Sequence, residues 1–171
     1  ETIRDKLHLN AEYIDFNYSV NKFKKDLSFD LGDSVLVGNS ATFSNNHLDV
    51  FTIIKDIDKK IITPLSYGAF GYQKYSKKVI DKGYELFHKN FLPITQFLAL
   101  NQYEEILVSC NTMIMYHIRQ QALGNIFMSL YIGMRVFLNK KSGTYKYLKE
   151  RGMIVFDLDS DFRLIGIELE K

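Results

Sequence analysis

Residues 35–51 read VLVGNSATFSNNHLDVF, and this stretch begins as a strand and ends as a helix. The β-branched run stops at Gly38, and the apolar residues after it, Leu48, Phe51 and Ile54, recur every three positions, as on one face of a helix. Between strand and helix lie seven polar side chains, more than a plain turn requires. The stretch therefore predicts a strand–turn–helix unit with an unusually polar turn.

Outward from this unit, strand and helix patterns alternate as far as about residue 157. Apolar runs predict further strands over 59–68, 90–95, 111–116, 134–139 and 153–158. Helical spacing predicts helices over 72–88, 100–110 and 142–152, and a polar loop that leads into a helix over 117–133. Such alternation predicts an α/β fold, a Rossmann-like three-layer sandwich whose mainly parallel sheet has helices on both faces.

Length and composition predict a single globular domain, formed by residues 35–171, on which a lead-in segment of residues 1–34 packs. The net charge of +2 is too small to favour nucleic acid as a partner. The single cysteine, Cys110, excludes an internal disulfide and is expected in the core of a protein from a reducing compartment. No pattern of a signal peptide or of a membrane-spanning run is present. Because the sequence starts at Glu1 rather than Met, we expect a fragment or a processed form.

The loops that follow the strands are the candidate sites, because ligands of open parallel sheets bind beyond the carboxyl ends of the strands. In the first loop, Gly38 permits a close backbone approach, and Ser44, Asn45 and Asn46 are good N-cap residues. His47 would then lie in the first turn of a helix whose N–H groups and dipole attract an anion. A capped turn with one surface histidine explains part of this cluster, but it explains the whole cluster less well.

The loop HIRQQALGN, residues 117–125, is a second polar cluster after a predicted strand. Arg119 is a fixed cation that can form paired hydrogen bonds with phosphate oxygens. His117 and Gln121 are four residues apart, as are Gln121 and Asn125, so each pair would share a helix face. A cap and a solvated polar patch would explain one glutamine, whereas the full set fits a ligand loop better. We expect this loop and the first one to emerge at the same edge of the sheet.

Two other loops carry weaker signals. The loop SYGAFGY, residues 66–72, has two glycines that suggest another close backbone approach, although a simple loop explains it almost as well. The loop PITQFLALNQ, residues 93–102, could hold a flat ring, or simply line the core. No carboxylate pair suited to acid–base catalysis and no cluster with metal-ligand spacing is apparent. The sequence therefore favours a nucleotide-holding half of an enzyme, whose catalytic base would lie on a partner domain.

The motifs GNSATFSNNHLDVF, PLSYG and HIRQQALGNI…YIGMRVF resemble the enterobacterial N-acetylfucosamine lipid II transferases, also called 4-alpha-L-fucosyltransferases. The resemblance runs from about residue 35 to about residue 156. It implies a GT-B type glycosyltransferase with two facing Rossmann-like domains, of which this chain would be the C-terminal, donor-binding half. The acceptor domain would then be missing from the chain.

The resemblance also implies the substrates and the cellular setting. The donor would be a dTDP-activated amino-deoxysugar, and the acceptor a saccharide linked to polyprenyl diphosphate. The enzyme would act in the cytoplasm at the inner face of the cell membrane, with a peripheral membrane association, and build surface polysaccharide such as enterobacterial common antigen. No cofactor or metal is expected. The isolated chain should bind nucleotide weakly and transfer nothing.

On this interpretation His47 and Arg119 are the catalytic candidates, with Arg119 neutralising the diphosphate as the glycosidic bond breaks. Gln120, Gln121 and Asn125 would bind sugar or ribose hydroxyls, where related transferases often have a Glu. The full set of predicted binding residues is Gly38, Asn39, Ser40, Asn45, Asn46, His47, Ser66, Tyr67, Gly68, His117, Arg119, Gln120, Gln121, Gly124 and Asn125. The alternative is a non-catalytic Rossmann-like module that binds a nucleotide, another small molecule or a protein. A phosphatase or kinase is disfavoured, because neither a Walker loop nor an acidic metal site is visible.

Overall fold

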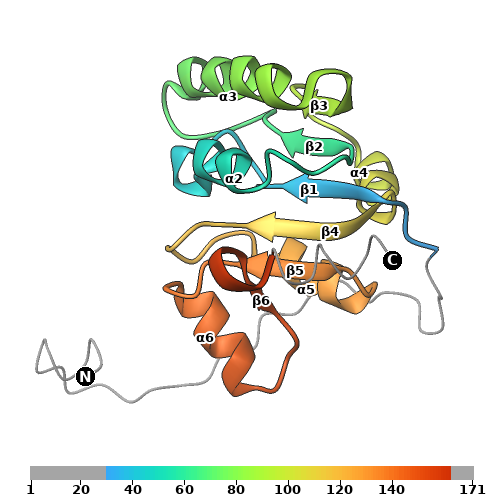
Figure 1. Ribbon diagram of the computed structural model, residues 1–171, viewed down its shortest axis with the longest axis vertical. Coiled ribbons are helices and arrows are strands. Elements are labelled where there is room, and N and C mark those ends of the chain that lie inside the picture. Colours follow the sequence, from blue (N-terminus) through green and yellow to red (C-terminus); the bar gives the residue numbers. More distant parts are fainter. Residues whose placement is uncertain (1–29, 163–171) are drawn as a thin grey trace, which may run out of the picture.

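The computed structural model describes residues 30–162, so most of the predicted lead-in segment lies outside the described residues. Six strands form one sheet in which every neighbouring pair is parallel (Figure 1). The strand order is β3-β2-β1-β4-β5-β6. The strands are β1 (Ser34–Val37), β2 (Ile61–Pro64), β3 (Phe91–Ile94), β4 (Cys110–Met115), β5 (Arg135–Leu138) and β6 (Phe156–Asp157). This is the Rossmann-like parallel sheet that the alternating pattern predicts.

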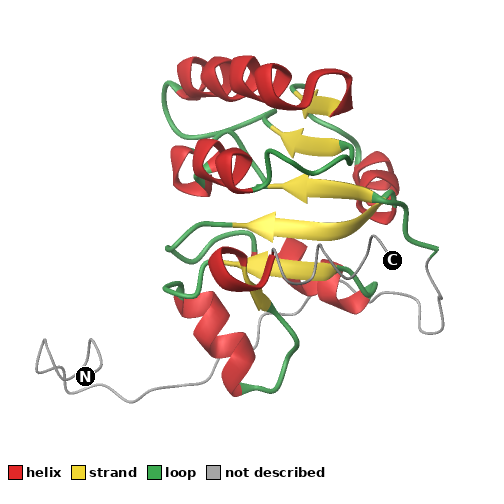
Figure 2. Cartoon of the chain, viewed as in Figure 1, coloured by secondary structure: helices red, strands yellow, loops and turns green. Residues whose placement is uncertain are grey.

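Helices connect successive strands, and loops, drawn in green, join the helices to the ends of the strands (Figure 2). The α-helices are α2 (His47–Ile53), α3 (Tyr72–Phe87), α4 (Leu100–Val108), α5 (Leu123–Tyr131) and α6 (Gly143–Glu150). Two 3₁₀ turns, η1 (Phe43–Asn45) and η2 (His88–Asn90), flank α2 and α3. Residues 158–162 are also helical.

The core has two halves, one on each face of the sheet, because successive residues of a strand point to opposite faces. Val35 and Val37 of β1 lie in the half that α2 and α3 cover, whereas Leu36 lies in the half that α4, α5 and α6 cover. In the first half the buried ring of Phe51 meets the rings of Phe87 and Phe91 edge to face, with centroids 5.3 and 5.6 Å apart. The predicted three-layer arrangement is confirmed.

Local signals predict several element ends correctly. Ser142 caps α6 by accepting a hydrogen bond from the Tyr145 backbone N–H at 3.0 Å. Pro64 is the last residue of β2, where its missing N–H costs least, although β2 is an inner strand. Leu100 is an exception: the spacing of apolar residues in the helix over 100–110 predicts that it faces inward, but it is 64% exposed at the start of α4. The fully buried residue of α4 is Leu107, near the other end of the helix.

Cys110 is buried at the start of β4, as its apolar neighbours predict. Burial raises the pKa of its thiol to about 11, so almost no reactive thiolate forms near neutral pH. Cys110 is therefore a core residue.

Candidate functional site

The loops after β1 and β4 leave the sheet side by side. Strand order reverses between these two strands, because β2 and β3 extend the sheet from β1 whereas β5 and β6 extend it from β4. The arrows in Figure 1 show that both loops begin at the same edge. In open α/β sheets, this reversal point is where ligands bind.

The side chain of Gln121 joins the two loops. Its Oε1 accepts a hydrogen bond from Ser44 Oγ at 2.8 Å. Its Nε2 donates to Asn45 Oδ1 at 2.9 Å and to Asn39 Oδ1 at 3.1 Å. Sequence reasoning places these loops at the same edge but does not predict that they bond to each other.

The asparagine pair does not cap α2 in the predicted way. Asn45 is 1% exposed, and its Nδ2 donates to the carbonyl oxygens of Ser40 at 2.9 Å and Thr42 at 3.3 Å. Asn46 occupies the N-cap position in a left-handed conformation, with φ 53°, and makes no side-chain cap. Its Nδ2 donates instead to the carbonyl oxygen of Tyr116 at 3.0 Å. Much of the polarity of this turn therefore serves to hold the loops together.

His47 lies beneath the turn rather than on the surface. Its side chain is fully buried, and its Nδ1 is 3.2 Å from the hydroxyl of Tyr75. A Cβ at Gly38 would lie 2.4 Å from His47 Nε2, so the close approach that Gly38 permits is made by this ring. Burial lowers the pKa of His47 to about 3. The imidazole is neutral at pH 7 and offers no positive charge to an anion. The prediction that His47 faces an anion from the first turn of the helix is corrected by this burial, and so is the alternative of a surface histidine.

The loop after β4 presents one cation beside the turn. Arg119 is exposed, and its Nε donates to Ser44 Oγ at 3.1 Å. His117 is 1% exposed, and its Nδ1 lies 2.9 Å from the carbonyl oxygen of Arg119, so this nitrogen carries the proton. Burial lowers the pKa of His117, and its Nε2 has no hydrogen-bond partner among residues 30–162. His117 is therefore a neutral support of the Arg119 backbone.

The amino end of α5 opens directly after this cation. Its N-cap is Ala122, which has a left-handed φ of 55° and no side chain that could cap the first turn. An added Cβ at Gly124 would meet nothing within 4 Å, so the helix start is not crowded there. Asn125, in the same first turn, is half-buried. A helix start without a capping side chain presents N–H groups and the positive end of its dipole to an anion.

The loop after β2 closes the other side of the turn. The carbonyl oxygen of Tyr67 accepts from the Ala41 N–H at 2.6 Å, and its hydroxyl accepts from Asn39 Nδ2 at 3.3 Å. A Cβ at Gly68 would lie 2.8 Å from the Ala41 carbonyl oxygen. The close approach predicted here is thus made to the chain itself. Ser66 is half-buried in this loop.

Sequence reasoning misses two tyrosines that support the site. Helical spacing over 72–88 places Tyr75 on the apolar stripe of α3, yet its hydroxyl is the partner of His47. The hydroxyl of Tyr116 donates to the Asp159 carboxylate at 2.8 Å and ties the loop after β4 to the segment after β6. A tyrosine on an otherwise apolar face was the available signal in both cases, but it does not identify the partner.

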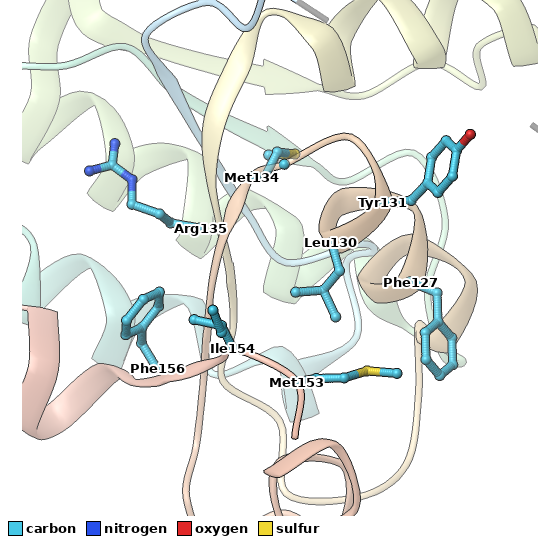
Figure 3. Close-up of a pocket in the computed structure, with 9 residues that line it drawn as sticks. Phe127, Leu130, Tyr131, Met134, Arg135, Met153, Ile154 and Phe156 are labelled. Carbon is cyan, nitrogen blue, oxygen red and sulfur yellow. The ribbon is translucent and has the colours of Figure 1, made fainter. Parts of the chain in front are cut away.

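An apolar groove of about 610 Å³ lies at the amino ends of β5 and β6 (Figure 3). It is lined by Phe127, Leu130, Tyr131, Gly133, Met134, Arg135, Met153, Ile154 and Phe156. These residues end α5, begin β5 and lead into β6, so the groove is separate from the polar loops.

Within residues 30–162, no group of three or more His, Cys, Asp or Glu side chains could hold a metal ion. No helix in that range has the length and apolar character needed to cross a membrane.

Two solved structures share this fold. A trehalose-6-phosphate synthase matches with a TM-score of 0.57 and 8% identity, over 77% of this chain and 33% of that one. The N-terminal domain of trehalose-6-phosphate phosphatase from Candida albicans matches with a TM-score of 0.54 and 15% identity, over 74% of this chain and 31% of that one. The chain thus spans about a third of the length of each structure, and such low identities show the fold alone.

The sequence itself matches a protein family over most of its length. The family is described as 4-alpha-L-fucosyltransferase glycosyl transferase group 56, and the match covers residues 12–163. This span includes both polar loops and agrees with the resemblance noted in their motifs. The chain therefore belongs to the 4-alpha-L-fucosyltransferase family of glycosyltransferases, group 56.

Proposed function

We propose that this domain holds the diphosphate of a nucleotide-sugar donor at the carboxyl ends of β1 and β4. The observation that carries the proposal is the uncapped amino end of α5 beside Arg119, at the reversal of strand order. The helix N–H groups and the guanidinium both favour a bound phosphate. Gln120, which is exposed next to Arg119, would hydrogen-bond a hydroxyl of the sugar or ribose.

The chemical role of this arrangement is to stabilise the leaving group. When the glycosidic bond breaks, negative charge grows on the nucleoside diphosphate. Arg119 and the α5 dipole would neutralise that charge without a metal ion. The neutral histidines, His47 and His117, would shape the site rather than bind charge. A catalytic base for the acceptor hydroxyl would come from a companion domain.

For the full-length enzyme we propose transfer of a dTDP-activated amino-deoxysugar, such as N-acetylfucosamine, to a polyprenyl-diphosphate-linked saccharide. Family membership supports a reaction of the 4-alpha-L-fucosyltransferase type. Peripheral binding at the inner face of the cell membrane would bring the enzyme to its lipid-linked acceptor. This reaction would contribute to the synthesis of surface polysaccharide.

Calorimetric titration of the chain with dTDP, UDP, GDP and NAD tests the proposal. We expect weak binding of dTDP, and NMR shifts on titration that map onto residues 38–47 and 117–125. Absence of heat with every diphosphate nucleotide, under conditions where the protein is folded, would overturn it. Shifts confined to other surfaces would favour a binding module with a different ligand.

Replacing Arg119 by Gln should weaken dTDP binding by about twentyfold, since a charged hydrogen bond to phosphate contributes roughly 1.5–3 kcal/mol. Arg151→Gln is the matched control, because it removes the same charge after the end of α6, where Arg151 stacks on Tyr147. Calorimetry on both variants makes the comparison. Equal weakening in the two would show that net charge, rather than the position of Arg119, determines affinity.

A further inference from the structure

We propose that Gln121, Ser44, Asn39 and Asn45 form a clasp that positions Arg119, and that Gln121 is a positioning residue rather than a ligand of the sugar. The inference rests on the proposed nucleotide site and deepens it. It also reassigns Gln121, which the sequence suggested as a partner of sugar or ribose hydroxyls. The clasp joins residues 76 to 82 positions apart in the chain, so it forms only when β1 and β4 are adjacent.

Most of the hydrogen-bonding capacity of Gln121 is used inside the protein. Both hydrogens of Nε2 go to amide oxygens, those of Asn39 and Asn45, and Oε1 receives the Ser44 hydroxyl hydrogen. The side chain is half-buried, whereas that of Gln120 is exposed. Only the second lone pair of Oε1 remains for a ligand hydroxyl, because both Nε2 hydrogens are already used. Gln120 is therefore the better candidate for such a contact.

The partners of Gln121 are themselves fixed in orientation. Asn45 Nδ2 donates to the carbonyl oxygens of Ser40 and Thr42, so its Oδ1 must face away from them, toward Gln121. Asn39 Nδ2 donates to the hydroxyl of Tyr67 at 3.3 Å, while its Oδ1 accepts from Gln121. Two acceptors and one donor thus surround the Gln121 side chain, and this pattern fits an amide in one orientation only.

Ser44 links Gln121 to Arg119 through two hydrogen bonds. Because its hydroxyl hydrogen is given to Gln121 Oε1, its oxygen accepts from Arg119 Nε at 3.1 Å. The direction of donation therefore runs from Arg119 through Ser44 to Gln121, and bonds in such a chain reinforce one another. Among residues 30–162 the Nη groups of Arg119 have no hydrogen-bond partner, so we infer that they bind the anion. His117 holds the Arg119 carbonyl oxygen, so both main chain and side chain of the cation are placed in advance.

Fixing the Arg119 side chain before the nucleotide binds affects affinity, because this side chain is exposed and long. An unrestrained arginine loses rotamer freedom when it binds phosphate, and this loss weakens binding. The clasp removes that freedom before the nucleotide arrives. Loss of the clasp should therefore reduce nucleotide affinity through Arg119, the group that the clasp positions.

A double-mutant cycle in the full chain tests the inference, with dTDP affinity measured by calorimetry. We expect Ser44→Ala to weaken dTDP binding about tenfold, as for loss of one hydrogen bond to a charged group. In the Arg119→Gln background the same change should have little further effect, because the group it positions is gone. Equal effects of Ser44→Ala in both backgrounds, or no effect in the wild-type background, would overturn the inference.

Gln121→Glu provides an isosteric second variant. It would set a carboxylate oxygen against the amide oxygens of Asn39 and Asn45, so we expect it to weaken dTDP binding at least as much as Ser44→Ala. Gln73→Glu makes the same chemical change at an exposed position on α3 and is the matched control. Equal dTDP affinities of the Gln121→Glu and Gln73→Glu variants would overturn the inference.

An NMR readout separates this inference from the proposed function. In the nucleotide-free wild type, the Arg119 Nε–H should exchange slowly with solvent, and Ser44→Ala or Gln121→Glu should accelerate the exchange at unchanged melting temperature. Fast exchange in the wild type would overturn the clasp whatever the ligand. If the clasp signals are present but no diphosphate nucleotide binds the wild type, the proposed function fails while the clasp stands.

Discussion

Replacing Gly38 by Ala should destabilise the domain by about 3 kcal/mol and abolish a folded turn after β1. Gly38 has φ +70°, and an L-residue in this left-handed region costs roughly 1–2 kcal/mol. The new Cβ would also lie 2.4 Å from Nε2 of the buried His47 ring. Overpacking of this kind typically costs about 1–3 kcal/mol. The ring cannot withdraw cheaply, because Tyr75 holds its Nδ1.

Urea unfolding at pH 7 measures this effect, with Gly71→Ala as the matched control. Gly71 has a similar φ of +74°, but a Cβ there would meet nothing within 4 Å. The control should therefore lose only the backbone contribution, about 1 kcal/mol. Equal destabilisation by the two substitutions would contradict the packing of His47 against Gly38. Nucleotide binding by the Gly38 variant should fall as well, since the turn carries Asn39 and Ser44.

Acid should destabilise the domain well before its carboxylates protonate. His47 has a pKa of about 3 in the folded protein against an ordinary value of 6.5, so the unfolded chain binds a proton that the folded protein refuses. The contribution of His47 to folding stability is therefore fully present above about pH 6.5, and it is lost as the pH falls toward 3. From pH 7 to pH 5, His47 alone should cost about 2 kcal/mol, at 1.36 kcal/mol per pH unit. His117, whose pKa burial also lowers, acts in the same direction.

The free energy of unfolding, measured with urea at pH 7, 6 and 5, checks this expectation. The hydrogen bond from Lys59 lowers the pKa of the Asp33 carboxyl. At Asp157 burial raises the pKa, but hydrogen bonds from Ser160 and Lys140 outweigh burial, so this pKa is lowered as well. Both carboxylates therefore lose their contribution to folding stability below pH 5, outside the range of these measurements.

Variants assign the slope to particular histidines. His47→Gln should flatten the dependence on pH between 7 and 5, and His117→Gln should flatten it further in the double variant. His88→Gln is the control, because His88 is exposed in η2. A stability that stays constant from pH 7 to pH 5 in the wild type would contradict the burial of a neutral His47.

The sequence by itself determined the parallel α/β architecture and many of its element ends. Alternating strands and helices, the Ser142 cap and the apolar setting of Cys110 all express local geometry, in which the period of the backbone decides which residues face the core. The motifs of the two polar loops also indicated the family, which the match over residues 12–163 confirms. These signals lie within a few residues of the structure that they specify.

Only the tertiary structure decided what the polar side chains of those loops bind. The sequence assigned the Asn45–Asn46 pair and His47 to an anion-binding helix start. In the structure Asn46 reaches across to the Tyr116 carbonyl oxygen, and His47 is buried against Gly38 and Tyr75. Gln121 likewise finds its partners on a loop about 80 residues away, because β4 lies next to β1. A side chain's hydrogen-bonding capacity is local, but its partner is chosen by strand order, which no local period encodes.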